Sequence, residues 1–270
     1  KDFSHISTKE WEAKISKDLK GLSIEELSWK YSNELTIKPF YHEHLKTISN
    51  SGGGYNYNLD CVFEKGAKDI NKAIKSIIKN GCSSIRIQNL VFDDIKTCFE
   101  GIDLCKVFWI IDTKNVIKDS QKWFSFLEIQ EIGKKIQGSF NSCPNCSLSD
   151  QKYVLEEYKT AYPNWTFLHL TDFFKGSHST ENFYEFKKNI IKIFDNNSSY
   201  DSILLEVTIA SNFFFEIAKI RAIRLLWDDL MNYFNSKCTL LIYTKDEIHN
   251  KEAEKPYNNL LRLTTEAMSA

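Results

Sequence analysis

Two cysteines stand at the spacing at which thiols bind zinc or exchange disulfides, in the segment Cys143-Pro-Asn-Cys146. A structural zinc site takes four ligands, and the sequence has no second Cys pair or His group at ligand spacing. A redox pair of the thioredoxin type would open a helix after a strand. We therefore interpret Cys143 and Cys146 as loop cysteines without a chemical role, and we predict no metal site.

The glycine-rich loop Ser49-Asn-Ser-Gly-Gly-Gly54 has the composition of a loop that cradles phosphate. A phosphate loop also needs a following Lys-Ser or Lys-Thr pair and a strand and a helix on its two sides. Neither is present here, so we do not predict a nucleotide site.

One charged side chain interrupts the apolar stripe of the longest helical pattern, which covers residues 213–234. Arg224 follows Ile220 and precedes Trp227 on the same face. A buried arginine needs a carboxylate or carbonyl partner, whereas an arginine at the edge of the stripe reaches water. Both interpretations stay open.

Strand-like and helix-like runs alternate from residue 55 onward. This alternation predicts an α/β fold with a parallel sheet, and near-continuous apolar strands such as 106–111 predict that the sheet is buried on both faces. We expect a TIM-type (β/α)8 barrel that lacks its last strand, with a doubly wound open sheet as the alternative. The predicted strands are 57–63, 84–90, 106–112, 136–142, 165–170, 202–209 and 238–244, and the predicted helices are 67–80, 91–99, 121–134, 150–161, 180–194, 213–234 and 256–269.

An N-terminal helical arm and an extended linker precede the barrel. We assign them to residues 1–54 and the barrel domain, incomplete at its C-terminus, to residues 55–270. Ser7-x-x-Glu10 and Ser23-x-x-Glu26 are capping-box patterns that predict two helices. Trp11, Ile15 and Leu19 share one stripe of the first helix. This stripe packs on its own domain or binds a partner. A barrel without its last strand exposes two edges, so we expect a fragment, or closure by a partner or a second copy.

Charge and hydropathy exclude several classes of function. The chain has 35 Lys and Arg against 36 Asp and Glu, a net charge of -1, so nothing indicates nucleic-acid binding. No run of about 18 uncharged apolar residues predicts a membrane span, and no signal peptide is recognisable. The seven scattered cysteines are typical of reduced thiols, and we predict a cytoplasmic protein.

Two long runs resemble one family. They are Asn212-Phe-Phe-Phe-Glu-Ile-Ala-Lys-Ile-Arg-Ala-Ile-Arg-Leu-Leu-Trp227 and Pro256-Tyr-Asn-Asn-Leu-Leu-Arg-Leu-Thr-Thr-Glu-Ala-Met-Ser-Ala270. They are similar to segments of the adenosylcobalamin-dependent methylmalonyl-CoA mutases. Shorter similar segments are Trp11-Glu-Ala-Lys-Ile15, Ile37-Lys-Pro-Phe-Tyr41, Ala67-Lys-Asp-Ile-Asn71 and Phe99-Glu-Gly-Ile-Asp-Leu104. The signature positions are Asn71, Phe213, Glu216, Lys219, Arg221, Arg224, Trp227, Tyr257, Asn258, Asn259 and Arg262.

The resemblance implies radical chemistry carried by a cofactor. In that family a barrel holds acyl-CoA along its axis and faces a separate cobalamin domain, and the enzyme interconverts methylmalonyl-CoA and succinyl-CoA. The protein encloses and orients the reactants while the cofactor supplies the radical. Many members pair a catalytic large subunit with a related small subunit that lacks the active-site residues.

The positions that carry catalysis in the family are changed in this sequence. The Arg-Gln-Tyr unit of the first strand becomes Asn58, Leu59 and Asp60, and a carboxylate cannot replace an aromatic wall. His178 stands near the family's Tyr-His unit but is displaced from it. The family's Arg-x-His-x-Gln set becomes Leu241, Tyr243 and Lys245, and its Arg-x-Ser set becomes Ser202 and Leu204. The family's cobalt-ligating Asp-x-His-x-x-Gly segment is not found.

The resemblance and these departures together predict a small, non-catalytic subunit of a methylmalonyl-CoA mutase, acting as scaffold and partner for the catalytic large subunit. Asp60, His178, Tyr243 and Lys245 are then degenerate positions. We expect no cofactor on this chain, and adenosylcobalamin in the holoenzyme. The alternatives are a diverged catalytic acyl-CoA mutase barrel that needs a cobalamin domain in trans, and a barrel protein of unrelated chemistry. A homodimer of the chain and the entry of acyl-CoA into the barrel stay open, as does whether the natural chain continues past Ala270.

Overall fold

A computed structural model gives the structure of the chain. It describes residues 6–20, 22–30, 36–39, 41, 60–63, 70–88, 90, 95–142, 148–174, 180–195, 200–246 and 255–269. The chain divides into two compact units, residues 1–50 and 51–270, and each is described by itself. The predicted boundary at residue 54 lies outside the described residues and stays a prediction.

The first unit is small and has no fully buried residue in its helix α1 (Thr8–Asp18). Both predicted capping boxes are present. Ser7 and Glu10 exchange hydrogen bonds, and the backbone N–H of Ser23 donates to the Glu26 carboxylate at 3.3 Å. The second predicted helix needs correction, because it is only the four-residue 3-10 helix Ile24–Leu27. It ends there because the chain becomes extended in β1 (Trp29–Lys30), which pairs antiparallel with β2 (Thr36–Ile37).

The second unit holds two parallel sheets, as the alternating pattern predicts. The order is β3-β4-β5-β6-β7 in the five-stranded sheet and β10-β9-β8 in the three-stranded sheet, and every described pair is parallel. The strands are β3 (Asp60–Phe63), β4 (Ser84–Ile87), β5 (Phe108–Thr113), β6 (Gln137–Ser142), β7 (Trp165–Thr166), β8 (Leu168–Phe174), β9 (Ser202–Ile209) and β10 (Thr239–Asp246).

The predicted fifth strand is divided between the two sheets. Residues 165–166 pair with β6, whereas β8 pairs with β9, and only Phe167 separates the two strands. If β7 and β8 are counted as one interrupted strand, the two sheets contain seven consecutive strand segments. Each segment lies beside its neighbour in sequence.

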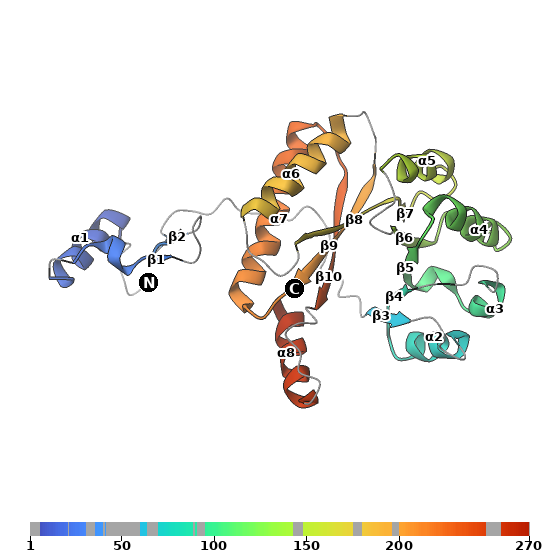
Figure 1. The fold of residues 1–270 in the computed structure, drawn as a ribbon, viewed down its shortest axis with the longest axis horizontal. Helices are drawn as coiled ribbons and strands as arrows, with labels where there is room; N and C mark the ends of the chain where they lie inside the picture. Colours follow the sequence, from blue (N-terminus) through green and yellow to red (C-terminus); the bar gives the residue numbers. More distant parts are fainter. Residues whose placement is uncertain are drawn as a thin grey trace. The chain divides into compact units, whose positions relative to one another are not determined.

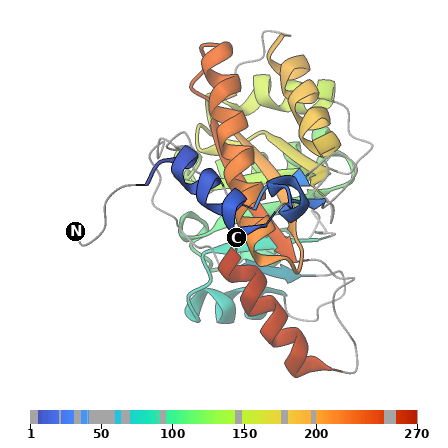
Figure 2. The same ribbon diagram turned by 90° about the vertical axis from the view of Figure 1, so that its left-hand side faces the viewer.

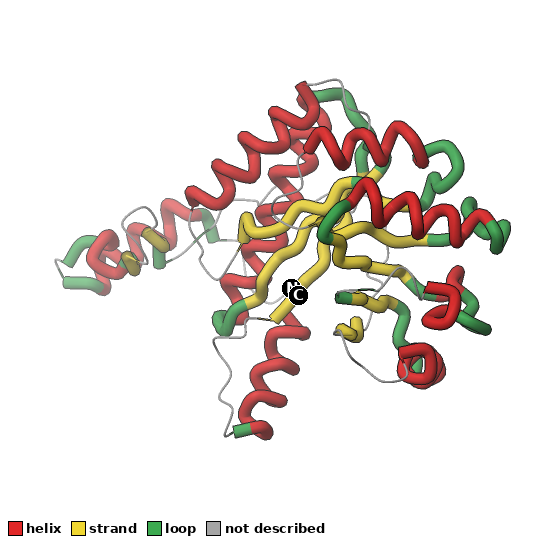
Figure 3. The backbone as a smooth tube through the Cα atoms, turned by 45° about the vertical axis from the view of Figure 1, so that its right-hand side comes forward, coloured by secondary structure: helices red, strands yellow, loops and turns green. Residues whose placement is uncertain are grey.

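Helices lie along the outer faces of the two sheets (Figures 1 and 3). Helices α2 to α5 flank the five-stranded sheet, and α6 and α7 flank the three-stranded sheet and run side by side (Figure 2). The helices are α2 (Ile70–Lys79), α3 (Ile95–Phe99), the 3-10 helix Leu104–Lys106, α4 (Val116–Glu128), α5 (Leu148–Tyr158), α6 (Thr180–Asp195), α7 (Phe213–Tyr233) and α8 (Pro256–Ser269).

Helix α4 differs most from its predicted range of 121–134. It begins at Val116 because the Asn115 side chain accepts a hydrogen bond from the backbone N–H of Lys118 at 3.0 Å. It ends before Glu131, whose φ of 55° is incompatible with a continuing helix. Asn115 is a typical N-cap residue, so the sequence did contain a signal for this start of the helix. The prediction followed the apolar periodicity instead and placed the start too late.

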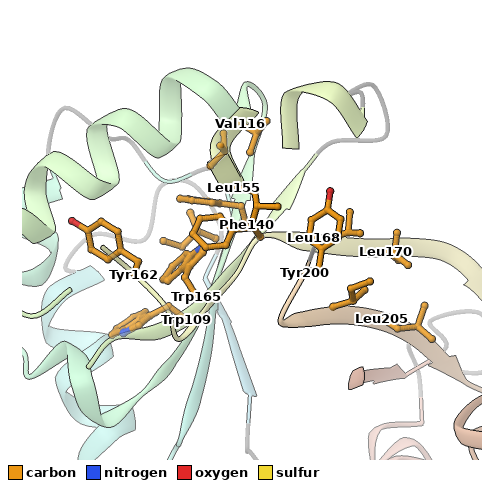
Figure 4. Close-up of a cluster of buried hydrophobic side chains, with 14 of the residues drawn as sticks. Trp109, Val116, Phe140, Leu155, Tyr162, Trp165, Leu168, Leu170, Tyr200 and Leu205 are labelled. Carbon is orange, nitrogen blue, oxygen red and sulfur yellow. The ribbon is translucent and has the colours of Figure 1, made fainter. Parts of the chain in front are cut away.

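Aromatic side chains fill the core between the five-stranded sheet and its helices. Figure 4 shows Trp109, Phe140 and Trp165 together there, with Leu168 and Leu205 continuing the apolar layer on the other sheet. The Trp165 ring lies directly on Gly138, where a Cβ atom would meet the ring at 2.6 Å. Glycine is therefore required at that point of β6 by close approach rather than by its φ angle.

Candidate functional site

Charged and polar residues gather on the face of the strands that is turned away from the helices. Successive strand residues point to opposite faces, and Ile85, Ile87, Leu205 and Val207 belong to the helix-side core. Arg86 and Glu206 must therefore point to the other face. The strand registers extend this face, because Asp112 stands opposite Asn141 and Glu206 opposite Tyr243.

Arg86 and Glu206 join the two sheets. The Nη1 of Arg86 on β4 donates to Oε2 of Glu206 on β9 at 3.0 Å. The Lys245 ammonium on β10 donates to the other oxygen, Oε1, of the same carboxylate. The side chain of Glu206 is 3% exposed, so both of its oxygens are satisfied by cations in a site with little water.

Asp112 holds the opposite edge of the Arg86 guanidinium. Arg86 Nε lies 3.1 Å from Oδ1 of Asp112, and Nη2 lies 3.3 Å from Oδ2. The Asn141 side-chain amide donates to Oδ1 of Asp112 at 2.8 Å. The Tyr243 ring stands 5.8 Å from the guanidinium carbon, within range of a cation–π interaction. Arg86 is thus fixed by residues of three other strands, β5, β9 and β10, and Asn141 on β6 supports Asp112.

His169 is the most deeply buried member of this polar cluster. Its side chain is 0% exposed, and its Nε2 lies 3.9 Å from Oε2 of Glu206. Within the described part of the chain, neither ring nitrogen of His169 has a hydrogen-bond partner. We call Arg86, Asp112, Asn141, His169, Glu206, Tyr243 and Lys245 the interior cluster.

Burial and charge set the protonation states in the interior cluster. Burial lowers the pKa of His169 to about 4. The Glu206 carboxylate acts in the opposite direction, and the cations of Arg86 and Lys245 lower the pKa further, so the imidazole is neutral at pH 7. Burial alone would raise the pKa of Glu206, but the hydrogen bond from Lys245 and the charge of Arg86 outweigh it and lower the pKa. Two cations therefore face two carboxylates, and the cluster is neutral.

Two signature residues of α7, Glu216 and Lys219, form a second buried ion pair. Lys219 lies 2.5 Å from the Glu216 carboxylate, and the two side chains are 2% and 0% exposed. Lys219 also donates to the backbone carbonyl of Thr208 on β9 at 2.7 Å. Trp227 donates to the carbonyl of Cys238 before β10 at 3.1 Å. These contacts attach α7 to the sheet beneath it.

The remaining signature residues lie outside the interior cluster. Asn71 donates from α2 to the carbonyls of Cys98 and Glu100 at 2.9 Å each, which ties α2 to the end of α3. Arg224 and Phe213 are half-buried and Arg221 is exposed. Helix α8 leaves Tyr257 and Asn258 exposed and Asn259 and Arg262 half-buried.

Two of the four degenerate positions meet in the interior cluster, namely Tyr243 and Lys245. Asp60 begins β3, and only its backbone is described. His178 lies outside the described residues, as do Cys143, Cys146 and the glycine-rich loop. Leu204 is buried on β9, and Ser202 shares a hydrogen bond of 2.8 Å with Thr166. That these positions are degenerate remains a prediction.

The sequence interpretation missed Arg86, Asp112, Asn141, His169 and Glu206. Their common signal is a charged or strongly polar residue at an alternate position of an otherwise apolar strand, as in Leu204-Leu-Glu-Val207. Within the described residues no group of three or more His, Cys, Asp or Glu could hold a metal ion. No helix in that part of the chain is both long and apolar enough to cross a membrane.

Comparisons with known proteins point to one family. Residues 194–270 match the family model of methylmalonyl-CoA mutase. The methylmalonyl-CoA mutases of Cereibacter sphaeroides and Rhizobium meliloti are 42% and 41% identical over 66 residues, or 23% of this chain and 9% of each protein. The methylmalonyl-CoA mutase small subunit of Porphyromonas gingivalis is 22% identical over the whole chain, which spans 52% of that protein.

Proposed function

We propose that the chain is a small, non-catalytic subunit of the methylmalonyl-CoA mutase family that serves as scaffold and partner for a catalytic large subunit. The full-length alignment with a small subunit supports this assignment. The observation that carries it is the interior cluster, in which Arg86, Glu206 and Lys245 bind one another instead of presenting free groups to a substrate.

We propose that the second unit is a (β/α)8 barrel of the TIM type that lacks its last strand. Its strand segments follow one another around the sheets in chain order, every described pairing is parallel, and the helices lie outside. The Arg86–Glu206 ion pair supports closure, since it joins β4 to β9 across the face that would line the barrel. An axial acyl-CoA would have to displace this pair and leave buried charges without partners, which is costly.

The described residues do not fit cobalamin. A histidine that ligates cobalt must present a ring nitrogen to a corrin, which is a large flat ring. His169 is the one histidine in the described part of the chain, and its side chain is 0% exposed inside the strand layer. In the proposed holoenzyme, adenosylcobalamin would be bound by the large subunit, where it would supply the radical.

The candidate partner surface is the stripe of Trp11, Ile15 and Leu19 on α1. All three side chains are half-buried, and the helix has no fully buried residue. Because these side chains are only half-buried, a partner that covers them would remove more apolar surface from water. That removal favours binding.

Co-purification tests the partner role. The tagged chain is co-expressed with a catalytic large mutase subunit and analysed by size-exclusion chromatography, and we expect one complex containing both chains. Trp11→Asp should weaken the complex, whereas Ser16→Asp, an exposed position on the same helix, should not. A chain that elutes apart from the large subunit, or only as its own dimer, would contradict the proposal.

A second measurement separates the non-catalytic role from a catalytic one. The isolated chain is mixed with adenosylcobalamin, and its visible absorption spectrum is recorded. We expect the spectrum of free cofactor. A shift to the form in which a protein histidine replaces the lower ligand would instead support a diverged catalytic barrel.

A further inference from the structure

We propose that Arg86 and Lys245 form a binding site for a carboxylate anion on the face of the strands that is turned away from the helices. The chain's own Glu206 occupies this site and excludes other anionic ligands from it. The proposal deepens the non-catalytic role and rests on it for its biological meaning. It names Glu206 as the residue that decides whether the interior accepts an anion.

The two cations approach Glu206 as they would approach a bound carboxylate. Each carboxylate oxygen has its own charged donor, Arg86 Nη1 on Oε2 at 3.0 Å and Lys245 Nζ on Oε1. Such charge-assisted pairs are the usual way in which proteins hold carboxylate ligands. The donors come from β4 and β10, so the anion position lies between strands of the two different sheets.

The site keeps its shape without Glu206. Asp112 binds the Nε and Nη2 edge of Arg86, and Asn141 in turn binds Asp112 at 2.8 Å, so Nη1 stays aimed at the anion position. His169 adds a second, independent feature. Its fully buried ring lies 3.9 Å from the Glu206 carboxylate with no hydrogen-bond partner among the described residues.

Charge balance explains why the native chain should not bind an added anion there. Arg86 and Lys245 are balanced by Asp112 and Glu206, so the native site is neutral. Removal of Glu206 leaves one uncompensated positive charge beside a buried space. Glu206→Ala deletes a CH2 and a carboxylate group, which are the heavy atoms of one acetate ion. Lys245 is 36% exposed, which gives a small ion a path to the site.

Acetate rescue of Glu206→Ala tests this proposal in the full chain. Thermal unfolding is followed in sodium acetate and in sodium chloride at equal ionic strength and at pH 7. We expect Glu206→Ala to gain roughly 5–10 °C from acetate at about a hundredfold excess over its Kd, because a ligand that binds only the folded state stabilises it. Propionate should do less, since the space left is that of acetate.

Three matched variants give the controls. Glu206→Gln fills the space without the charge and should show no acetate effect, as should the native chain and Glu185→Ala, which removes a half-exposed carboxylate of α6. Glu206→Ala/Lys245→Met should lose most of the acetate effect. If acetate stabilises all chains equally, or Glu206→Ala no more than chloride does, the proposal is wrong.

Refolding keeps the test decisive if Glu206→Ala does not fold in chloride. The yield of folded chain is then compared after refolding in acetate and in chloride, and we expect acetate alone to restore it. A chain that folds in neither salt contradicts the proposal, because the site should recover its missing anion. The large subunit takes no part, so a negative result here leaves the partner test intact.

Discussion

Arg86 and Glu206 stand 120 positions apart in the chain, yet their side chains meet at 3.0 Å between the two sheets. The side chains are 11% and 3% exposed, so the pair is largely removed from water. A buried pair of this kind adds little net stability over an apolar pair, but it is costly to break and it favours one arrangement of the strands over others. We infer that it fixes how β4 faces β9.

Replacing Arg86 alone should destabilise the second unit strongly. Arg86→Met leaves the buried Glu206 and the partly buried Asp112 with fewer partners, and we expect a loss of about 3–5 kcal/mol in the free energy of unfolding, measured by urea denaturation at pH 7. Lys188→Met on α6 breaks a half-exposed pair with Glu185 and should cost less than about 1 kcal/mol. Equal losses in the two variants would show that the interior pair is not special.

The neutral, buried His169 makes stability depend on pH. Its pKa is lowered from 6.5 to about 4 in the folded chain, so the unfolded chain takes up a proton at a higher pH than the folded chain does. Stability should therefore be constant above pH 6.5 and fall as the pH drops from 6.5 toward 4, by about 3 kcal/mol in all. Urea denaturation at a series of pH values measures this slope.

His169→Gln provides the control for that slope. Glutamine does not titrate, so the fall between pH 6.5 and about 4.5 should disappear, whatever the variant costs at pH 7. The pKa of Glu206 is also lowered, so its contribution is lost only at the acidic end, as the pH falls through its folded value. An unchanged slope in His169→Gln would mean that another group carries the pH dependence.

Much of the fold could be predicted because its signals are local. Helix α8 spans Pro256–Ser269 and β9 spans Ser202–Ile209, the predicted ranges, since Pro256 favours a first turn and β9 is rich in Ile, Leu and Val. The break at Phe167 was not predicted, because residues 165–170 give one continuous strand pattern. Only the pairing of β7 with β6 and of β8 with β9 divides it.

The interior cluster could not be assembled from the sequence for a related reason. The alternation of side chains along a strand places Glu206 and Leu205 on opposite faces of the sheet, but it does not say which of the two faces is covered by helices. Arg86 and Glu206 acquire meaning only when β4 and β9 are placed opposite each other. The resemblance of α7 to the family, by contrast, was visible in the sequence. The structure shows that Lys219 binds β9 and forms a buried ion pair with Glu216.

The buried pair of α7 should be structural rather than part of a binding surface. Lys219→Met leaves the Glu216 carboxylate buried and removes the bond to Thr208, so we expect a loss of about 3–5 kcal/mol in the free energy of unfolding. Arg221→Met, at an exposed signature position on the same helix, should change stability by less than about 0.5 kcal/mol. Chemical denaturation followed by circular dichroism measures both.

A double variant and a binding assay with the large subunit distinguish a structural role of the Glu216–Lys219 pair from a role in partner binding. If Glu216→Gln/Lys219→Met regains much of the stability lost in Lys219→Met, the cost came from the uncompensated charge. A Lys219→Met chain that keeps native stability but no longer binds the large subunit would contradict the structural role.

Gly138 tests the packing of the aromatic core. A Cβ atom at this position would overlap the backbone carbonyl of Trp109 and lie 2.6 Å from the Trp165 ring, and neither can move without disturbing β5 or β7. Gly138→Ala should therefore lower the free energy of unfolding by about 3 kcal/mol, as overpacking of a rigid core does. Gly81→Ala is the control, since it meets nothing within 4 Å and carries only the strain of a φ of 91°. It should cost about 1 kcal/mol. Near-ultraviolet circular dichroism of the tryptophans should change in Gly138→Ala alone, and an unaltered spectrum with native stability would contradict the close contact of Trp165 with β6.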